Sequence, residues 1–129
     1  MLFRSPQLII DKFNDYFVIQ TLALGIDKWK PAIVSALNKI FTPKGIYERN
    51  DVPVRELEGL PQQKGFLSAP FETTITINEN GLKFQVDIEN GQKTGYFLDQ
   101  QDNRRAIQHI VKDATVLRSE EHTSELQSH

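Results

Sequence analysis

Hydrophobic and polar residues in the opening part of the chain follow a strand pattern. The apolar run Leu8-Ile9-Ile10 and Phe13 stops at Asn14-Asp15, and both of these residue types favour turns. Residues 16–24 then resume with aromatic and β-branched side chains that leave almost no polar face. The pattern predicts a β-hairpin whose second strand is buried on both faces and is therefore central in its sheet.

The next stretch changes to helical spacing. Large apolar residues recur every three or four positions, at Trp29, Ile33, Leu37 and Ile40 or Phe41. Asp27 is placed to cap such a helix, and Pro31 is tolerated in its first turn. We therefore predict a helix over residues 27–41 that packs on the hairpin through this apolar stripe, Trp29 included.

Residues 42–70 are predicted to hold little regular structure beyond one strand. The sequence Pro43-Lys44-Gly45 ends the helix, and Ile46-Tyr47 begins the strand. Residues 48–58 mix both charge signs, which is typical of a solvated linker with weak surface ion pairs. Prolines and glycines punctuate residues 53–70, so this segment is interpreted as a junction between domains.

After Pro70 the pattern becomes strictly alternating. Apolar residues occupy every second position on both sides of the turn sequence Glu79-Asn80-Gly81, at Ile75, Ile77, Leu82, Phe84, Val86 and Ile88. This predicts a second β-hairpin with one apolar face. Such a hairpin needs a surface to cover that face, because two strands alone are marginally stable in water.

Candidate chemistry lies directly after this hairpin. Gly91 and Gly95 flank Lys93-Thr94 and predict a loop whose backbone N–H groups point outward, toward a small polar ligand. Asp99 is placed to cap a following helix, with Asp102 in its first turn. The alternative interpretation is a glycine turn that only leads into a well-capped helix.

Composition narrows the possible functions. The chain has no cysteine, which excludes disulfides and thiolate metal sites and suits a cytoplasmic location. Its formal net charge of −2 at pH 7 lacks the basic excess of most nucleic-acid-binding modules. No apolar run reaches membrane-spanning length, and no metal-ligand cluster, phosphate loop or catalytic triad is found. We expect neither a membrane nor a metal partner, and we expect His109 to be a surface residue without a catalytic role.

Three segments resemble one family and occur in the order that the family has. They are Lys-Gly-Ile-Tyr-Glu-Arg-Asn-Asp at residues 44–51, Glu-Gly-Leu-Pro at 58–61, and the stretch 91–104. Through them the chain resembles bacterial class I S-adenosylmethionine-dependent methyltransferases of the 23S ribosomal RNA, in particular those that form 5-methylcytosine. Gln101 stands where the family usually carries Arg.

This resemblance implies a domain division and a cofactor. Residues 6–69 correspond to a central α+β domain, and residues 70–117 to the start of a truncated, Rossmann-like methyltransferase domain whose first strand begins at Thr115. S-adenosylmethionine is the implied cofactor of the intact enzyme, and ribosomal RNA is its partner. The residues implied to border the cofactor are Lys93, Thr94, Gly95, Phe97, Asp99, Gln100 and Asn103.

Both ends of the chain resemble translated sequencing adapters. Residues 118–129 read as a common short-read adapter translated in one frame, and residues 1–5 resemble the other adapter end. We therefore expect both segments to be foreign to the fold.

The expected fold class is α+β, with two β-hairpin units and two main helices. The expected function is that of an inactive fragment of the methyltransferase. The glycine loop of the cofactor site would follow residue 117, and cytosine C5 chemistry needs a cysteine nucleophile. S-adenosylmethionine is accordingly not expected to bind tightly. Two alternatives are a self-standing RNA- or protein-binding module and a structural domain without a site.

Overall fold

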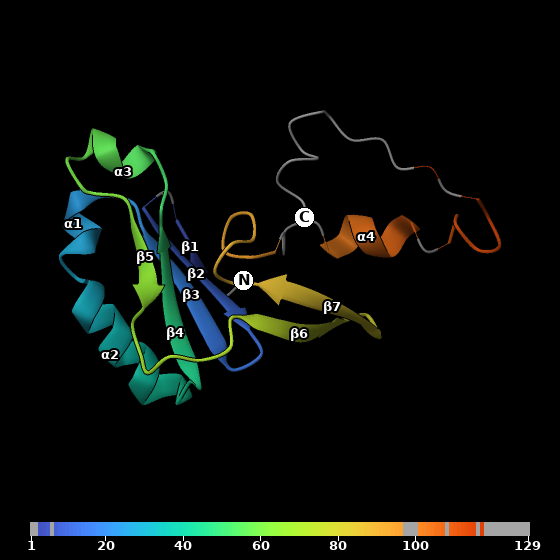
Figure 1. Ribbon diagram of the computed structural model, residues 1–129, viewed down its shortest axis with the longest axis horizontal. Coiled ribbons are helices and arrows are strands. Elements are labelled where there is room, and N and C mark those ends of the chain that lie inside the picture. Colours follow the sequence, from blue (N-terminus) through green and yellow to red (C-terminus); the bar gives the residue numbers. More distant parts are fainter. Residues whose placement is uncertain (1–2, 6, 97–100, 108, 116, 118–129) are drawn as a thin grey trace. The chain divides into compact units, whose positions relative to one another are not determined.

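The chain divides into two compact units (Figure 1). The computed structural model describes residues 3–5, 7–96, 101–107, 109–115 and 117. The units are Met1–Phe97, which contains strands β1 to β7 and helices α1 to α3, and Leu98–His129, which contains α4 (Gln101–Ile107). The second hairpin therefore lies in the same unit as the first, whereas the sequence suggested a boundary after residue 69. The assignment of family domains stays a prediction.

The first unit is built on a five-stranded mixed sheet in the order β1-β2-β3-β4-β5. Its strands are β1 (Phe3–Arg4), β2 (Leu8–Phe13), β3 (Tyr16–Thr21), β4 (Gly45–Asn50) and β5 (Gln63–Phe66). The expectation that residues 1–5 are foreign to the fold is wrong for Phe3 and Arg4, which pair with Ile10 and Ile9. Residues 118–129 lie outside the described residues. Neighbours are antiparallel except for β3 and β4, which are parallel. The predicted first hairpin is confirmed as β2–β3, with Asn14 in the left-handed region of its turn. β3 is buried after its first residue, as expected for a central strand.

The crossover between β3 and β4 contains α1 (Leu24–Asp27) and α2 (Lys30–Phe41). The predicted helix thus begins three residues later than expected. Asp27 does not cap it, because α2 has no side-chain cap and the Asp27 carboxylate binds other partners. Trp29 is also not part of the buried stripe: its side chain is 65% exposed, and this part of the prediction is wrong.

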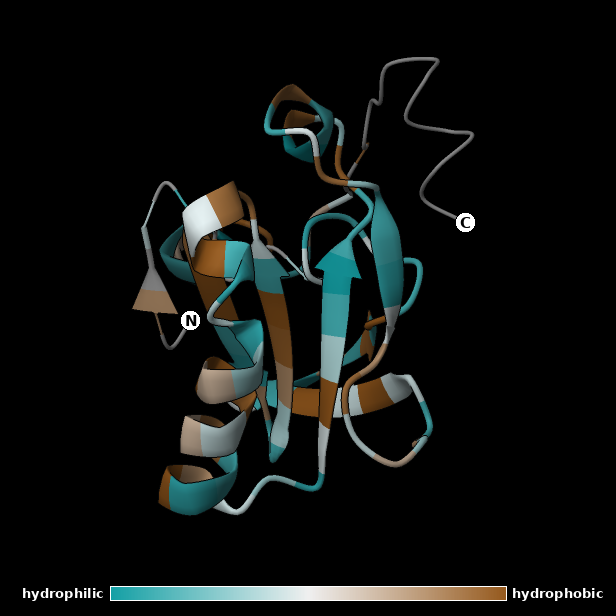
Figure 2. Cartoon of the chain, turned by 90° about the vertical axis from the view of Figure 1, so that its left-hand side faces the viewer, coloured by the Kyte–Doolittle hydropathy of each residue, from teal (hydrophilic) through white to brown (hydrophobic). Residues whose placement is uncertain are grey.

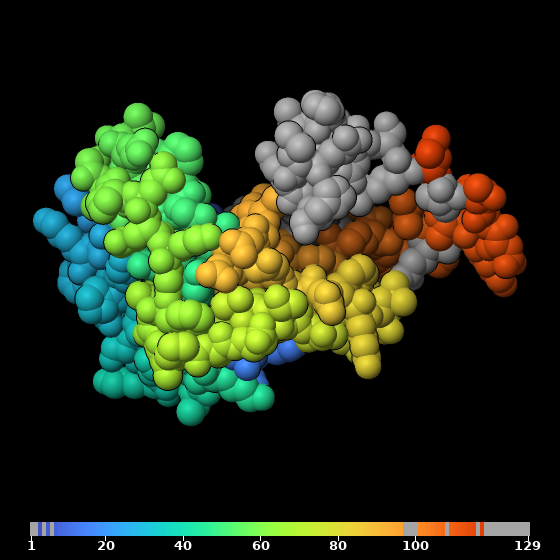
Figure 3. All heavy atoms as spheres, in the orientation of Figure 1, coloured from blue at the N-terminus to red at the C-terminus, as the bar shows by residue number. Residues whose placement is uncertain are grey.

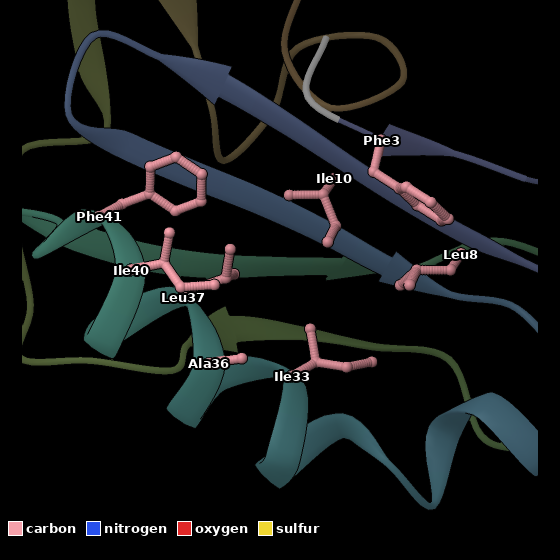
Figure 4. Close-up of a pocket in the computed structure, with 8 residues that line it drawn as sticks. All are labelled: Phe3, Leu8, Ile10, Ile33, Ala36, Leu37, Ile40 and Phe41. Carbon is pink, nitrogen blue, oxygen red and sulfur yellow. The ribbon is translucent and has the colours of Figure 1, made fainter.

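The hydrophobic core lies between α2 and one face of the sheet. It contains Ile10, Phe17, Ile19, Leu37 and Ile46, with Leu8, Ile33, Val34 and Leu67 packed around it. In Figure 2 the middle of β3 is brown, and β4 is brown near its start and teal toward its end. Beside the core, α2 and the strands border an apolar groove of about 330 Å³, into which Ile10 and Phe41 project from opposite sides (Figure 4).

The segment between β4 and the second hairpin is more regular than predicted. It forms α3 (Val54–Leu57) and β5, whose register with β4 places Tyr47 opposite Phe66 and Arg49 opposite Lys64. The interpretations of a solvated linker and of a structureless junction are therefore wrong. Glu48, Arg49, Asn50 and Arg55 are all buried.

The second hairpin is confirmed as β6 (Thr74–Glu79) and β7 (Leu82–Asp87). Its apolar face buries Ile75, Ile77, Val86 and Ile88. The hairpin is tied to the first one, because the Asn14 side-chain amide donates to the carbonyl of Thr76. Phe71, just before β6, stacks on Tyr16 and meets Phe66 edge-on.

In the second unit, α4 (Gln101–Ile107) carries Asp102 in its first turn, as predicted. His109 is exposed, also as predicted. Thr115 and Leu117 are not in a strand, so the expected first strand of a nucleotide-binding sheet is not seen at these two positions. Within the part of the chain that the structure describes, no helix is both long and apolar enough to cross a membrane.

Candidate cofactor-binding loop

The loop after β7 is packed onto the sheet instead of standing free. The Gly91 N–H donates to the carbonyl of Asp87, and the Gly95 N–H donates to that of Gln92. The expectation that the loop N–H groups point outward is wrong for these two glycines. Thr94 between them is only 1% exposed, and its hydroxyl donates to Asp11 Oδ2 on β2.

Close packing explains why both loop positions are glycine. A Cβ atom on Gly91 would lie 2.4 Å from the Asp87 carbonyl oxygen and 2.6 Å from that of Gly95. Gly95 has φ +129, and its Cβ would lie 2.9 Å from a methyl group of Val86. Any side chain would push the loop off the hairpin. Glycine at these two positions therefore allows the loop to pack closely on the hairpin, independently of any ligand.

Two further strands of the sheet bind the same loop through polar side chains. On β4, Arg49 Nη1 donates to the carbonyls of Ile88 at 2.9 Å and Gly91 at 2.7 Å. On β5, Lys64 Nζ donates to the carbonyl of Glu89 and to Asn90 Oδ1, at 3.1 and 3.2 Å. Figure 3 shows the orange atoms of this turn beside the yellow-green atoms of β5.

Burial and neighbouring charges shift the pKa values of two groups on this face, Asp51 and Tyr47. Arg49 Nε and Nη2 donate to the two oxygens of Asp51, at 3.0 and 3.3 Å. Burial by itself raises the pKa of the Asp51 carboxyl. The hydrogen bond and charge of Arg49 outweigh this effect, and the pKa lies below its ordinary value. The pKa of the nearby Tyr47 hydroxyl is raised by burial and by the negative charge of Glu89.

The structure places only some of the predicted cofactor residues. Lys93 is exposed and lies next to the buried Thr94 and the half-buried Gly95, with its backbone in the left-handed region at φ 56. Asn103 is exposed on α4, which belongs to the other unit. Phe97, Asp99 and Gln100 lie outside the described residues, and so does the predicted cap at Asp99.

Sequence reasoning missed a second polar cluster, at the carboxyl ends of the parallel strands β3 and β4. Its centre is Arg55 on α3, whose side chain is completely buried. Arg55 Nη1 donates to the Thr21 carbonyl and to Asp27 Oδ1, the latter at 2.8 Å, and Nε donates to the carbonyl of Pro61. One side chain thus connects the segments after β3, after β4 and before β5.

The rest of this cluster balances its charges. Lys30 Nζ lies 2.8 Å from Glu48 Oε2 and 3.6 Å from Asp27 Oδ1. The Asn50 amide donates to Glu48 Oε2, and its carbonyl oxygen accepts from the Thr21 N–H. Burial raises the pKa of the Asp27 carboxyl. Hydrogen bonds from Arg55 and Thr21, with the charge of Lys30, outweigh it and bring the pKa below its ordinary value.

A signal for this cluster was present in the sequence. Glu48 and Asn50 alternate with Tyr47 and Arg49, and so they share a face with the core residue Ile46. Polar residues at inward positions of a strand require buried partners of opposite charge or hydrogen-bonding capacity. Neither cluster resembles a metal centre: across the described ranges, no group of three His, Cys, Asp or Glu side chains could hold an ion.

Comparison with curated proteins gives a consistent set of relatives. The chain is 46% identical over 114 residues to the ribosomal RNA large subunit methyltransferase I of Aliivibrio fischeri strain MJ11. It is 44% identical over 112 residues to the protein of that name from Alteromonas mediterranea, and 48% over 113 residues to that from Pseudoalteromonas translucida. Each alignment covers 87% of this chain. The chain spans only 28% of the length of these relatives.

Solved structures share the fold. A candidate SAM-dependent methyltransferase from Streptococcus mutans superposes with a TM-score of 0.62 over 78% of this chain and 25% of that one, at 24% identity. A candidate methyltransferase complexed with SAH gives the same score over 78% of this chain and 24% of its own. No protein-family model matches the chain.

Proposed function

We propose that this chain is a segment of an S-adenosylmethionine-dependent methyltransferase that acts on large-subunit ribosomal RNA in the cytoplasm. The observation that carries the proposal is the identity of 42 to 48% to proteins named ribosomal RNA large subunit methyltransferase I, along 87% of this chain. The fold shared with a solved methyltransferase structure over 78% of this chain is consistent with it. In this proposal residues 6–69 belong to the central domain and residues 70–117 to the start of the methyltransferase domain.

The loop at Lys93-Thr94-Gly95 would form one border of the cofactor site, together with Phe97, Asp99, Gln100 and Asn103. The residues present fit this role in part. Lys93 is exposed and its backbone is held between two anchored neighbours, which suits a contact with a polar ligand. Thr94 would act on the loop and not on the ligand, because its buried hydroxyl donates to Asp11 and anchors the loop to β2.

We propose cytosine C5 as the target of the intact enzyme, and that this chain alone is inactive. Methylation at C5 proceeds through a covalent adduct of a thiolate with the neighbouring ring carbon, and the chain has no cysteine to form it. The predicted cofactor residues, from Lys93 to Asn103, would also border only one side of the cofactor, and the opposite side would need other residues. Binding of S-adenosylmethionine by this chain is therefore expected to be weaker than about 1 mM.

Calorimetric titration of the purified chain with S-adenosylmethionine tests this proposal, with the full-length Aliivibrio fischeri relative as the positive control. The expected result is heat of binding for the relative and none for this chain. A transfer assay with labelled S-adenosylmethionine and ribosomal RNA follows the same comparison. Micromolar binding or methyl transfer by this chain would overturn the inactive-segment proposal. Tight RNA binding without any cofactor binding would favour a self-standing RNA-binding module.

A further inference from the structure

We infer that Arg49 is a positioning residue, which holds the backbone of the loop at residues 88–95 in one conformation on the sheet. Any effect of this role on cofactor binding rests on the proposed function. The role itself rests on contacts within the first unit. Arg49 is 7% exposed and donates four hydrogen bonds, two to loop carbonyls and two to the carboxylate of Asp51.

The two hydrogen bonds to Asp51 fix the orientation of the Arg49 guanidinium independently of the loop. Nε and Nη2 bind the two oxygens of Asp51 as a fork, which sets the plane of the group. Nη1 is then directed at the carbonyls of Ile88 and Gly91. These carbonyls lie on either side of the turn, so one donor nitrogen fixes both ends of it. A hydrophobic side chain could fill the same space but could not specify carbonyl positions.

Arg49 acts together with two neighbours on the same face of the sheet. The register places Asp11 opposite Val18 and Val18 beside Tyr47, so these three side chains share one face. Arg49 lies two residues after Tyr47 and opposite Lys64, which adds both to that face. Three strands therefore supply Asp11, Arg49 and Lys64 to successive points of one loop.

The consequence is a fixed backbone at Lys93. Gly91 accepts from Arg49 on one side of it, and Thr94 donates to Asp11 on the other. Lys93 between them has a positive φ, which a non-glycine residue adopts at a cost unless its surroundings hold it there. The sheet thus presents this residue in a defined orientation through contacts that do not involve a ligand.

Amide hydrogen exchange on the full chain, without any cofactor, tests the inference. The variant is Arg49→Lys, which keeps the charge but not the fork. The matched control is Arg55→Lys, at another buried arginine, whose bonds go to the other polar cluster. The probes are the amides of Gly91 and Gly95 in the loop and of Ile33 and Leu67 in the core, all of which donate to backbone carbonyls.

In Arg49→Lys the loop amides should exchange roughly tenfold faster or more, because bonds from a charged donor are lost locally. The core amides should stay within about twofold of the parent chain, as expected for a local opening. Arg55→Lys should leave the loop-to-core ratio unchanged. Equal acceleration of loop and core by Arg49→Lys, or equal acceleration of the loop by both variants, would show a general structural role and overturn the inference.

Arg49→Met provides a second variant, which removes the donors altogether. If neither Arg49 variant accelerates the loop amides, the inference is wrong. Since the experiment contains no S-adenosylmethionine, its failure would leave the proposed function standing. Failure of the titration described above would likewise leave the loop anchoring standing.

Discussion

Arg55 and Arg49 are only a few positions apart in a stretch that reads as a solvated charge run, yet both are buried. The reason is that each finds carbonyl acceptors and a carboxylate within reach, Asp27 for Arg55 and Asp51 for Arg49. A buried guanidinium is tolerated when its charge is paired and most of its donors are bound. Among the described residues all three nitrogens of Arg49 donate, whereas Nη2 of Arg55 is buried without a hydrogen-bond partner. The two arginines then determine where the segments around them lie.

Replacing Arg55 with methionine should strongly destabilise the first unit. The substitution removes the Arg55 donors from the Asp27 carboxylate and from the carbonyls of Thr21 and Pro61. Removal of one member of a buried pair typically costs about 3–5 kcal/mol. Urea unfolding followed by circular dichroism measures the change in the free energy of unfolding. The exposed Lys28→Ala is the control and should change that energy by less than about 0.5 kcal/mol. Similar values for the two variants would contradict the role of Arg55.

The same cluster should make stability depend on pH through Asp27. Its pKa in the folded chain lies below the ordinary value of 3.8, so the folded state favours the charged carboxylate. This contribution is present above the unfolded pKa, near pH 4, and is lost as the pH falls through the folded pKa. Asp27→Asn should therefore be less stable than the parent at pH 7 and lose less stability on acidification.

Asp15→Asn is the control for this pH series. Its carboxylate is 60% exposed and 3.9 Å from Lys44, so its removal should leave the acid limb of the parent chain unchanged. Urea midpoints measured between pH 7 and pH 2.5 provide the comparison. An acid limb in Asp27→Asn as steep as in the parent would show that other carboxylates dominate it.

These residue-level features were only partly predictable. The glycines at 91 and 95 correctly predicted a turn after the second hairpin. The sequence could not show that Thr94 would donate to Asp11, which is far away in the chain. Charge pairs between distant segments depend on the strand register, which a sequence of mixed charges does not specify. The roles of Phe97, Asp99 and Gln100 remain predictions.

At the scale of elements, alternation and turn residues predicted both hairpins correctly. Helical spacing predicted α2 but extended its buried stripe too far. The stripe at Ile33 and Leu37 belongs to α2, whereas Trp29 precedes the helix and projects into solvent. Strand β5 was missed, because the glycine and prolines around it read as a junction. Its pairing with β4 overrides that local composition.

Leu37→Ala and Trp29→Ala form a matched test of where the stripe ends. Leu37 is 5% exposed in the core, so its truncation should lower the free energy of unfolding by about 2–5 kcal/mol. Trp29 is largely exposed, and its truncation should cost less than about 0.5 kcal/mol. Thermal and urea unfolding of both variants give the two values. A larger loss for Trp29→Ala than for Leu37→Ala would reverse the assignment.

Glycines of two neighbouring strands should differ in their tolerance of a methyl group. A Cβ on Gly45 in β4 would lie 2.3 Å from the ring of Phe71, which is itself held by Tyr16 and Phe66. Gly45→Ala should therefore cost about 1–3 kcal/mol through overpacking. A Cβ on Gly65 in β5 meets nothing within 4 Å, so Gly65→Ala should be neutral or slightly stabilising. Equal urea midpoints for the two variants would contradict this packing.

For the whole molecule, the important feature is that the core and both polar clusters lie inside the unit Met1–Phe97. The sequence predicted the class of this architecture, α+β with two hairpins, but not that the hairpins share one unit. That outcome depends on the bonds from Asn14, Arg49 and Lys64 to the second hairpin and its loop. Such long-range contacts are not visible in local periodicity.

A chain ending at Phe97 should fold on its own. All residues of the hydrophobic core and of the two polar clusters remain in it, so its melting temperature should stay within about 4 °C of that of the full chain. Differential scanning calorimetry on both chains is the measurement. A broad transition, or a decrease well beyond that range, would show that residues after Phe97 are required for the stability of the first unit.

The parallel pairing of β3 with β4 has a consequence for how quickly the sheet can assemble. The two hairpins β2–β3 and β6–β7 join neighbours in the chain, and such units form in about 1–10 μs. β4 can pair with β3 only after the intervening chain, with α1 and α2, has folded back. Closing this loop costs conformational entropy before the β3–β4 contacts can stabilise the chain. We therefore expect the rate-limiting transition state to contain the β3–β4 pair and the docked α2. Substitutions at Ile46 should slow refolding, whereas those at Ile75 should mainly accelerate unfolding.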